Sequence, residues 1–149
     1  MERSTEVHVL VVAHKTAATP ALLEAMGERA ERDPCRFTLV VPNPVDGLAP
    51  GPRQEEWKRT EGRQVLALAL PLMEEAVGAP VDGWVATDPS AVDVVQEAVW
   101  TGDYDEIIVS TLPHPVSHWL HIDLPARISN LGLPVTTVVA QHEARVPSA

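Results

Sequence analysis

The sequence predicts a single α/β domain over residues 1–149, built on a five-stranded parallel sheet that is doubly wound, with helices on both faces. Two observations predict this fold class. Short runs rich in valine and isoleucine alternate with longer segments of helical periodicity, as in repeated strand–helix–strand units. The short runs lack a regular polar alternation, as strands covered by helices on both faces do. No linker or internal repeat divides the chain, and residues 141–149 are polar enough to fray.

The first 42 residues predict two strands with a helix between them. Residues 7–13 are apolar except for His8 and form the first strand, and residues 36–42 form the second. Thr19 is placed to cap a helix that starts at Pro20 and runs to about residue 32. The inner face of this helix is expected to comprise Leu22, Leu23, Met26 and Ala30.

A proline- and glycine-rich loop, residues 43–53, follows on the side of the sheet where such folds bind ligands. It is interpreted as a surface connection, with a lid as the alternative. A helix is expected over residues 54–77, weakened at Gly62 and bent or divided at Pro71. The side chains available for burial are Trp57, Val65, Leu68, Leu72 and Met73.

The second half of the chain continues the alternation. Residues 81–87 predict the third strand, in which Gly83 marks a bulge or a close approach. Asp88 and Pro89 repeat the cap-and-proline signal, which starts a helix that runs to about residue 101. The remaining strands are expected at residues 106–111 and 134–140, with a helix between them whose buried stripe comprises Leu120, Leu124, Ile128 and Leu131.

Composition excludes several classes of function. A formal net charge of −10 and a pI near 4.9 argue against nucleic acids and anionic membranes, which are bound through clustered Lys and Arg. No run of about 18 apolar residues predicts a membrane span, and the apolar run at residues 7–13 is too short for a secretory signal. The single cysteine, Cys35, favours a reducing cytoplasm and is expected to be a small buried hydrophobe, with a reactive thiol as the alternative.

Polar residues gather where two expected strands end. His14, Lys15 and Thr16 follow the first strand, and Ser110 and Thr111 end the fourth. These strands are expected to be neighbours at the point where the strand order reverses, which is where ligands bind in such sheets. Hydroxyl groups, a lysine and the N-terminus of the next helix can hold a phosphate or another anion. The alternative interpretation is that the hydroxyls only satisfy turns.

The segment after Thr111 is rich in histidine. His114, His118 and His121 have the spacing of metal ligands on one side of a helix. Pro125 disfavours helical geometry just before it and places the helix start near residue 123, so exposed or loop-packed histidines are favoured and no metal is predicted.

The sequence has no GxSxG, GxxxxGK[ST], HExxH or CxxC motif, so no catalytic residue is predicted. Three tryptophans are expected in the core or at an interface: Trp84, Trp100 and Trp119.

The segments YDEIIVST and GLPVTTVV, preceded by TDPSAVDVV, resemble the universal stress protein family over nearly the whole chain. The resemblance implies a Rossmann-like sheet of the adenine nucleotide alpha hydrolase-like type with strand order 3-2-1-4-5. It also implies a cytoplasmic location and a homodimer formed through the last strand, residues 134–140. That strand carries no charge, and pairing with a second subunit would protect an edge that otherwise invites aggregation.

The sequence departs from the family where nucleotides bind. Nucleotide-binding members end the fourth strand in glycine, two residues, glycine, nine residues, then glycine and a hydroxyl residue, and these backbone amides cradle ATP phosphates. Here no glycine occurs between Gly102 and Gly132, and STLPHPVSHWLHI stands in that place. Side chains with Cβ atoms, and Pro113 and Pro115 without N–H groups, cannot reproduce the cradle.

A second departure lies at the end of the first strand, where Ala13 and His14 replace an aspartate that contacts the adenine region in the family. The expected function is therefore a cytoplasmic domain without catalysis, without strong ATP or AMP binding and without a cofactor. It would act through dimerisation and association with a protein or a weakly bound small ligand. The alternative is a nucleotide- or anion-binding protein or enzyme with a phosphate site made of side chains. The candidate ligand-binding residues are Ala13, His14, Lys15, Val41, Ser110, Thr111, His114, Ser117 and His118.

Overall fold

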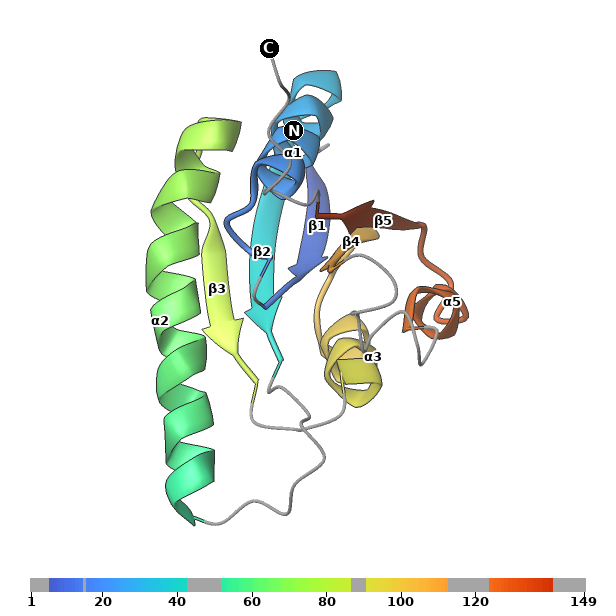
Figure 1. Ribbon diagram of the computed structural model, residues 1–149. Coiled ribbons are helices and arrows are strands. Elements are labelled where there is room, and N and C mark those ends of the chain that lie inside the picture. Colours follow the sequence, from blue (N-terminus) through green and yellow to red (C-terminus); the bar gives the residue numbers. More distant parts are fainter. Residues whose placement is uncertain (1–5, 15, 43–51, 87–90, 113–123, 141–149) are drawn as a thin grey trace, which may run out of the picture.

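The computed structural model describes residues 6–14, 16–42, 52–86, 91–112 and 124–140, and for residues 52–59 it describes the backbone alone. Five strands form one parallel sheet in the order β3-β2-β1-β4-β5, which confirms the predicted fold class and strand order (Figure 1). The strands are β1 (Val7–Val12), β2 (Cys35–Val41), β3 (Asp82–Val85), β4 (Glu106–Thr111) and β5 (Val135–Val139). The order reverses between β1 and β4, because β1 pairs with β2 on one side and with β4 on the other.

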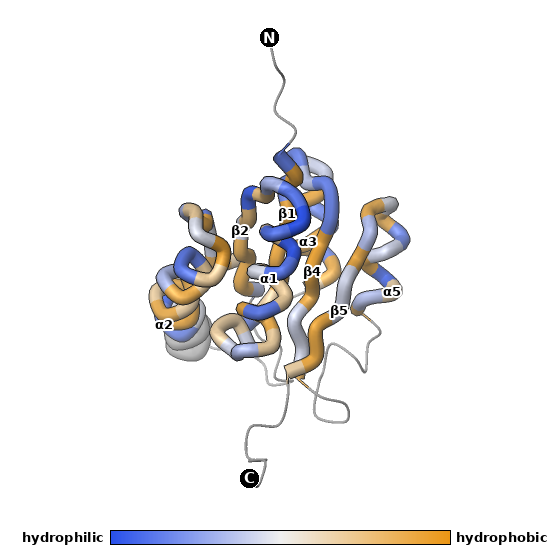
Figure 2. Tube along the Cα trace, turned by 90° about the horizontal axis from the view of Figure 1, so that it is seen from above, coloured by the Kyte–Doolittle hydropathy of each residue, from blue (hydrophilic) through white to orange (hydrophobic). Residues whose placement is uncertain are grey.

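Helices cover both faces of the sheet. The described helices are α1 (Pro20–Arg32), α2 (Pro52–Val77), α3 (Ala91–Thr101) and α5 (Leu124–Ser129). Figure 2 shows α1 and α2 on one side of the strands and α3 and α5 on the other. Each side has its own core cluster, because successive side chains of a strand point to opposite faces.

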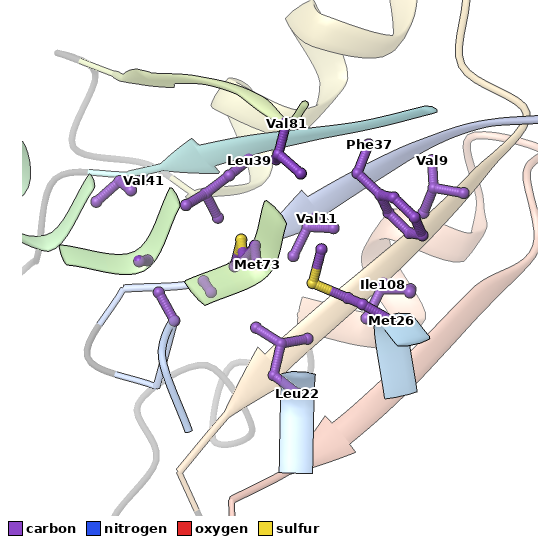
Figure 3. Packing of buried hydrophobic residues seen from close by; sticks show 13 residues of the cluster. Val9, Val11, Leu22, Met26, Phe37, Leu39, Val41, Met73, Val81 and Ile108 are labelled. Atoms are coloured by element: carbon purple, nitrogen blue, oxygen red, sulfur yellow. The ribbon is translucent and has the colours of Figure 1, made fainter. Parts of the chain in front are cut away.

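The core cluster under α1 and α2 is drawn in Figure 3. Phe37 of β2, Leu22 and Met26 of α1, and Met73 of α2 are fully buried there together with two valines of β1, Val9 and Val11. Burial of each such large side chain contributes about 1.5–3 kcal/mol. The predicted inner face of α1 is confirmed, since Leu23 and Ala30 also pack against this cluster.

The start of α1 differs from the prediction in one respect. The helix begins at Pro20, as expected, but the Thr19 hydroxyl makes no capping bond to it. That hydroxyl instead donates to the carbonyl of Thr16 at 2.9 Å, and the Thr19 N–H donates to the same carbonyl at 3.2 Å. Thr19 therefore stabilises the turn before the helix.

The prediction for α2 was wrong about two of its leucines. Leu68 is 65% exposed and Leu72 is 39% exposed, because the face of the helix that meets the sheet runs through Ala69 and Met73. Pro71 does not divide the helix, which continues from Pro52 to Val77. Pro71 lies on the exposed side, where water can bond the backbone carbonyl that its ring leaves without a donor.

Two glycines allow α2 and β3 to approach closely. A Cβ atom on Gly83 of β3 would lie 2.7 Å from Leu66 of α2, and one on Gly62 of α2 would lie 2.8 Å from Val85 of β3. The close approach predicted at Gly83 is confirmed. Gly62 was interpreted as a weak point of the helix, but its burial against Val85 gives it a packing role.

The last described helix starts at Leu124, with Pro125 at its second position, where a proline is tolerated. Leu124 and Ile128 are fully buried, as predicted, and Leu131 packs against the same cluster. Trp84 and Trp100 do not lie in the core, since they are 38% and 71% exposed, and their alternative place at an interface stays a prediction. Trp119 lies outside the described residues.

Within the described parts of the chain, no helix is long and apolar enough to cross a bilayer.

Candidate functional site

The carboxyl ends of β1 and β4 lie side by side, since Val12 pairs with Val109 in the sheet. The residues that follow Val12 and Val109 make up a buried polar region, which we call the β1/β4 mouth: residues 13, 14 and 16 with residues 110 and 111. All five residues are buried, including four that are polar. Parallel α/β sheets bind ligands at this place.

Thr16 and Ser110 join the two sides of the mouth. Their hydroxyl oxygens are 2.6 Å apart, and both side chains are buried. The bond links residues 94 positions apart in the sequence, so it fixes the turn after β1 against the end of β4. The sequence placed both residues at this end of the sheet but did not predict that they bond to each other. The only signal for the bond was the presence of a hydroxyl residue after each strand.

Thr111 is the next residue along β4 but lies on the opposite face. Ile108 belongs to the core cluster under α1 and α2, whereas Ile107 and Val109 belong to the other cluster, so Ser110 and Thr111 alternate in the same way. The Thr111 backbone carbonyl accepts a hydrogen bond from the Ala140 N–H at 2.8 Å. Thr111 is 2% exposed, and its hydroxyl has no hydrogen-bond partner among the described residues.

The remaining predicted site residues divide into two groups. Ala13 and Val41 are fully buried in the core under α1 and α2, so their side chains line the base of the mouth rather than a polar surface. The Val41 carbonyl accepts the Ala86 N–H at 2.9 Å and is thus used within the sheet. His14 is buried at the mouth. Four candidates fall outside the described residues: Lys15, His114, Ser117 and His118.

Cys35, the single cysteine, does not have the surroundings of a reactive thiol. Cys35 is half-buried, and its thiol donates to the Arg29 carbonyl over 3.8 Å. Burial raises the pKa of the Cys35 thiol, an effect that the nearby Arg29 charge opposes only in part. The thiol therefore stays protonated near neutral pH, which favours the structural interpretation over the reactive one. The described residues hold no group of three or more His, Cys, Asp or Glu that could bind a metal ion, and His121 lies outside them as well.

No family model and no curated protein matches the chain. Solved structures do match it. A universal stress protein from Archaeoglobus fulgidus superposes with a TM-score of 0.63 at 13% identity, over 89% of this chain and 93% of its own. A universal stress protein family member from Burkholderia pseudomallei superposes with a TM-score of 0.65 at 18% identity, over 92% of this chain and 98% of its own. One from Arabidopsis thaliana, with AMP bound, superposes with a TM-score of 0.57 at 16% identity, over 95% of this chain and 96% of its own.

The sheet and its mouth define an α/β protein of the Rossmann-like type with a polar region at the reversal of strand order. Its fold is that of the universal stress proteins. The resemblance inferred from the sequence is confirmed at the level of the fold. At 13–18% identity the likeness shows the fold alone, so what the neighbours bind is a property of those proteins.

Proposed function

We propose that this protein is a divergent, cytoplasmic, universal-stress-protein-like homodimer that has no catalytic role and binds adenine nucleotides weakly or not at all. It acts through association with a protein or a weakly bound small ligand. The observation that supports this proposal is a complete fold with an altered phosphate region. AMP is bound in the Arabidopsis structure, yet this sequence has no glycine between Gly102 and Gly132.

The mouth supports the same proposal. Phosphate cradles use backbone N–H groups that only glycine leaves fully accessible. Here the Thr16 and Ser110 hydroxyls are hydrogen-bonded to each other in a buried position, so a phosphate would have to compete with that bond. Ala13, which follows β1, offers no polar side chain to an adenine or a ribose.

Calorimetric titration of the purified, untagged protein with ATP and with AMP tests the nucleotide part. We expect dissociation constants in the millimolar range or no measurable heat, because the backbone cradle is missing. A dissociation constant in the micromolar range for either nucleotide would contradict the proposal.

The proposed homodimer forms through β5. This strand pairs with β4 on one side, and no described strand pairs with its other side. Residues 134–140 carry no charge, and Val139 is 40% exposed. An uncharged edge that no described strand covers favours pairing with another strand. A twofold axis through the middle of β5 would pair it antiparallel with its own copy.

Thr137→Lys tests the dimer, because Thr137 is the exposed central residue of β5. Near the twofold axis two lysines would face each other, so we expect sedimentation velocity to show a monomer for this variant and a dimer for the parent protein. Gln64→Lys adds the same charge to the exposed surface of α2 and serves as the control. A parent protein that sediments as a monomer at high concentration would remove the dimer from the proposal.

One observation favours a second candidate, a binding site for a nucleotide or another anion built from side chains. The Thr111 hydroxyl is buried without a described partner, and such a group costs about 1–3 kcal/mol unless a ligand or a water satisfies it. The titration distinguishes the candidates. Micromolar binding of ATP that is lost in Thr111→Val would establish the side-chain site, whereas weak heats that are the same in both proteins would support the first candidate.

A further inference from the structure

A groove of about 250 Å³ lies between β3 and α3, away from the β1/β4 mouth. On the strand side its described lining is residues 84–86, and on the helix side it is Val94, Glu97, Ala98 and Thr101. We call it the Trp84 groove. None of its lining residues belongs to the mouth, and none was predicted as a ligand-binding residue.

The arrangement of the helices explains the groove. Gly83 and Val85 of β3 face α2, so the side chain of Trp84, between them in the strand, points to the opposite face. On that face the buried residues of α3 share one core cluster with side chains of β1, β2 and β4, among them Leu10, Val40 and Val109, whereas Trp84 of β3 is not part of the cluster. The edge strand β3 is therefore not fully covered by α3, and Trp84 remains 38% exposed in the uncovered part.

The lining combines an aromatic wall, an aliphatic floor and one ionisable group. Val94 and Ala98 are buried and form the floor, and Trp84 forms the wall. Among the described lining residues, Glu97 is the one with an ionisable side chain, and it is exposed. The Thr101 hydroxyl donates to the backbone carbonyl of Glu97 at 2.9 Å and so does not engage the Glu97 carboxylate. Asp82 begins β3 two residues before Trp84 and is not among the residues that line the groove.

We propose that the Trp84 groove binds a small organic cation that carries its charge on an apolar body. The negative face of an indole ring attracts a cation that lies over it. The apolar body would contact the aliphatic floor, while the Glu97 carboxylate pairs with the charge. The net charge of −10 favours the approach of a cation over that of an anion. The volume lies just below the range of about 300–1,000 Å³ that holds drug-sized ligands, so the ligand is smaller than those.

Three probes with one shared body and different head groups test the proposal: 2-phenylethylammonium, 2-phenylethanol and 3-phenylpropanoate. The chain has four tryptophans, and the indole N–H signal of Trp84 in a proton–nitrogen NMR spectrum is the one that disappears in Trp84→Leu. We expect saturable shifts of that signal with the ammonium probe, about tenfold weaker binding of the alcohol, and no binding of the carboxylate.

Variants assign the affinity to the named groups. We expect Trp84→Leu to lower the affinity for the ammonium probe about 5- to 30-fold, as followed through the backbone signals of Val94 and Ala98. Glu97→Gln should lower this affinity about threefold and reduce the preference for ammonium over alcohol. Trp100→Leu is the matched control, because Trp100 is 71% exposed on α3 and does not line the groove, and it should leave binding unchanged.

Several results would overturn the proposal. They are the absence of any saturable shift with the ammonium probe, equal affinity for ammonium and alcohol, or full affinity in Trp84→Leu. An unchanged preference in Glu97→Gln would do so as well. These outcomes are independent of the nucleotide titration, since the groove shares no residue with the mouth.

Discussion

The two ends of the sheet satisfy their polar groups differently. At the amino end, where β1 and β4 begin, the side chains of Arg29 and His8 each form hydrogen bonds to two other residues. At the carboxyl end, the mouth contains one pair of hydroxyls bonded to each other and one buried hydroxyl with no described partner. Among the described residues, the polar side chains at the amino end are thus bonded within the protein, whereas the carboxyl end includes a buried hydroxyl without a described partner.

Arg29 of α1 is the main polar link at the amino end. Its Nε and Nη2 atoms donate to the two carboxylate oxygens of Glu106 at 3.0 Å each, and Nη1 donates to Asp33 at 2.9 Å. The bonds to Glu106, and then to Asp33, raise the pKa of the Arg29 guanidinium above its ordinary value. The side chains of Arg29 and Glu106 are largely buried, so the bidentate pair joins α1 to the start of β4 with little competition from water.

His8 of β1 is the second polar link at this end. Its Nδ1 atom lies 3.1 Å from the Asp103 carbonyl, which can only accept, so Nδ1 carries a proton. Its Nε2 atom lies 3.0 Å from the Thr38 hydroxyl and accepts a hydrogen bond from it when the ring is neutral. The backbone N–H of His8 donates to Asp105 at 2.9 Å. The loop before β4 is therefore tied to both β1 and β2.

The difference indicates where a function can reside. A polar group that is satisfied within the protein stabilises the fold, whereas a buried group that the protein leaves unsatisfied marks a place where local rules of folding are not fully met. In parallel α/β sheets that place is expected at the carboxyl end. The three predictions that follow test this contrast, from the largest expected change in stability to the smallest.

Arg29→Met should lower the free energy of unfolding by about 2–3 kcal/mol, because it leaves the largely buried Glu106 carboxylate without its partner. Chemical denaturation at neutral pH measures the change. Arg32→Met removes an exposed arginine from the same helix end and should cost under about 0.5 kcal/mol. Equal effects of the two substitutions would show that the amino end does not depend on this ion pair.

Thr16→Val should lower the free energy of unfolding by about 1–2 kcal/mol, because the buried Ser110 hydroxyl loses its partner. Combining it with Ser110→Ala removes both hydroxyls, and the double variant should recover most of that loss. A double-mutant cycle measured by denaturation gives the coupling. Simple additivity of the two substitutions would mean that the bond contributes nothing to stability.

Thr111→Val should raise the free energy of unfolding by about 1 kcal/mol, because a methyl group replaces a buried hydroxyl without a described partner. Thr38→Val is the matched change at the amino end, where the hydroxyl is bonded to His8, and it should lower stability by about the same amount. Changes in the free energy of unfolding that have opposite signs in the two variants would sharpen the contrast between the two ends. A loss of stability in both variants would show that the Thr111 hydroxyl has a hydrogen-bond partner after all and would remove the contrast.

Much of the fold was predictable from the sequence, because it depends on local patterns. The valine-rich runs located all five strands, and Pro20 and Pro125 lie at the starts of helices where their missing N–H groups are tolerated. The face of α2 was mispredicted because several of its faces contain leucine or alanine, so periodicity alone did not select the one that meets the sheet.

The candidate site was less predictable, because it depends on contacts between distant parts of the chain. The sequence located Ser110 and Thr111 at the mouth from their place at a strand end. It did not show that one is bonded to Thr16 and the other is not, since that follows from the face each residue occupies in the folded sheet. The Trp84 groove was missed because it depends on how far α3 extends over the edge strand, which the sequence pattern does not record.

The contacts of His8 provide an internal spectroscopic reporter. The ring of His8 packs on Tyr104, with 4.3 Å between the ring centroids and an angle of 41° between the planes. Tyr104 is the single tyrosine of the chain, so its ring protons give one set of NMR signals, and the His8 ring current shifts them while the packing persists. Local opening at the amino end is thus observable without a label, and separately from unfolding of the whole domain.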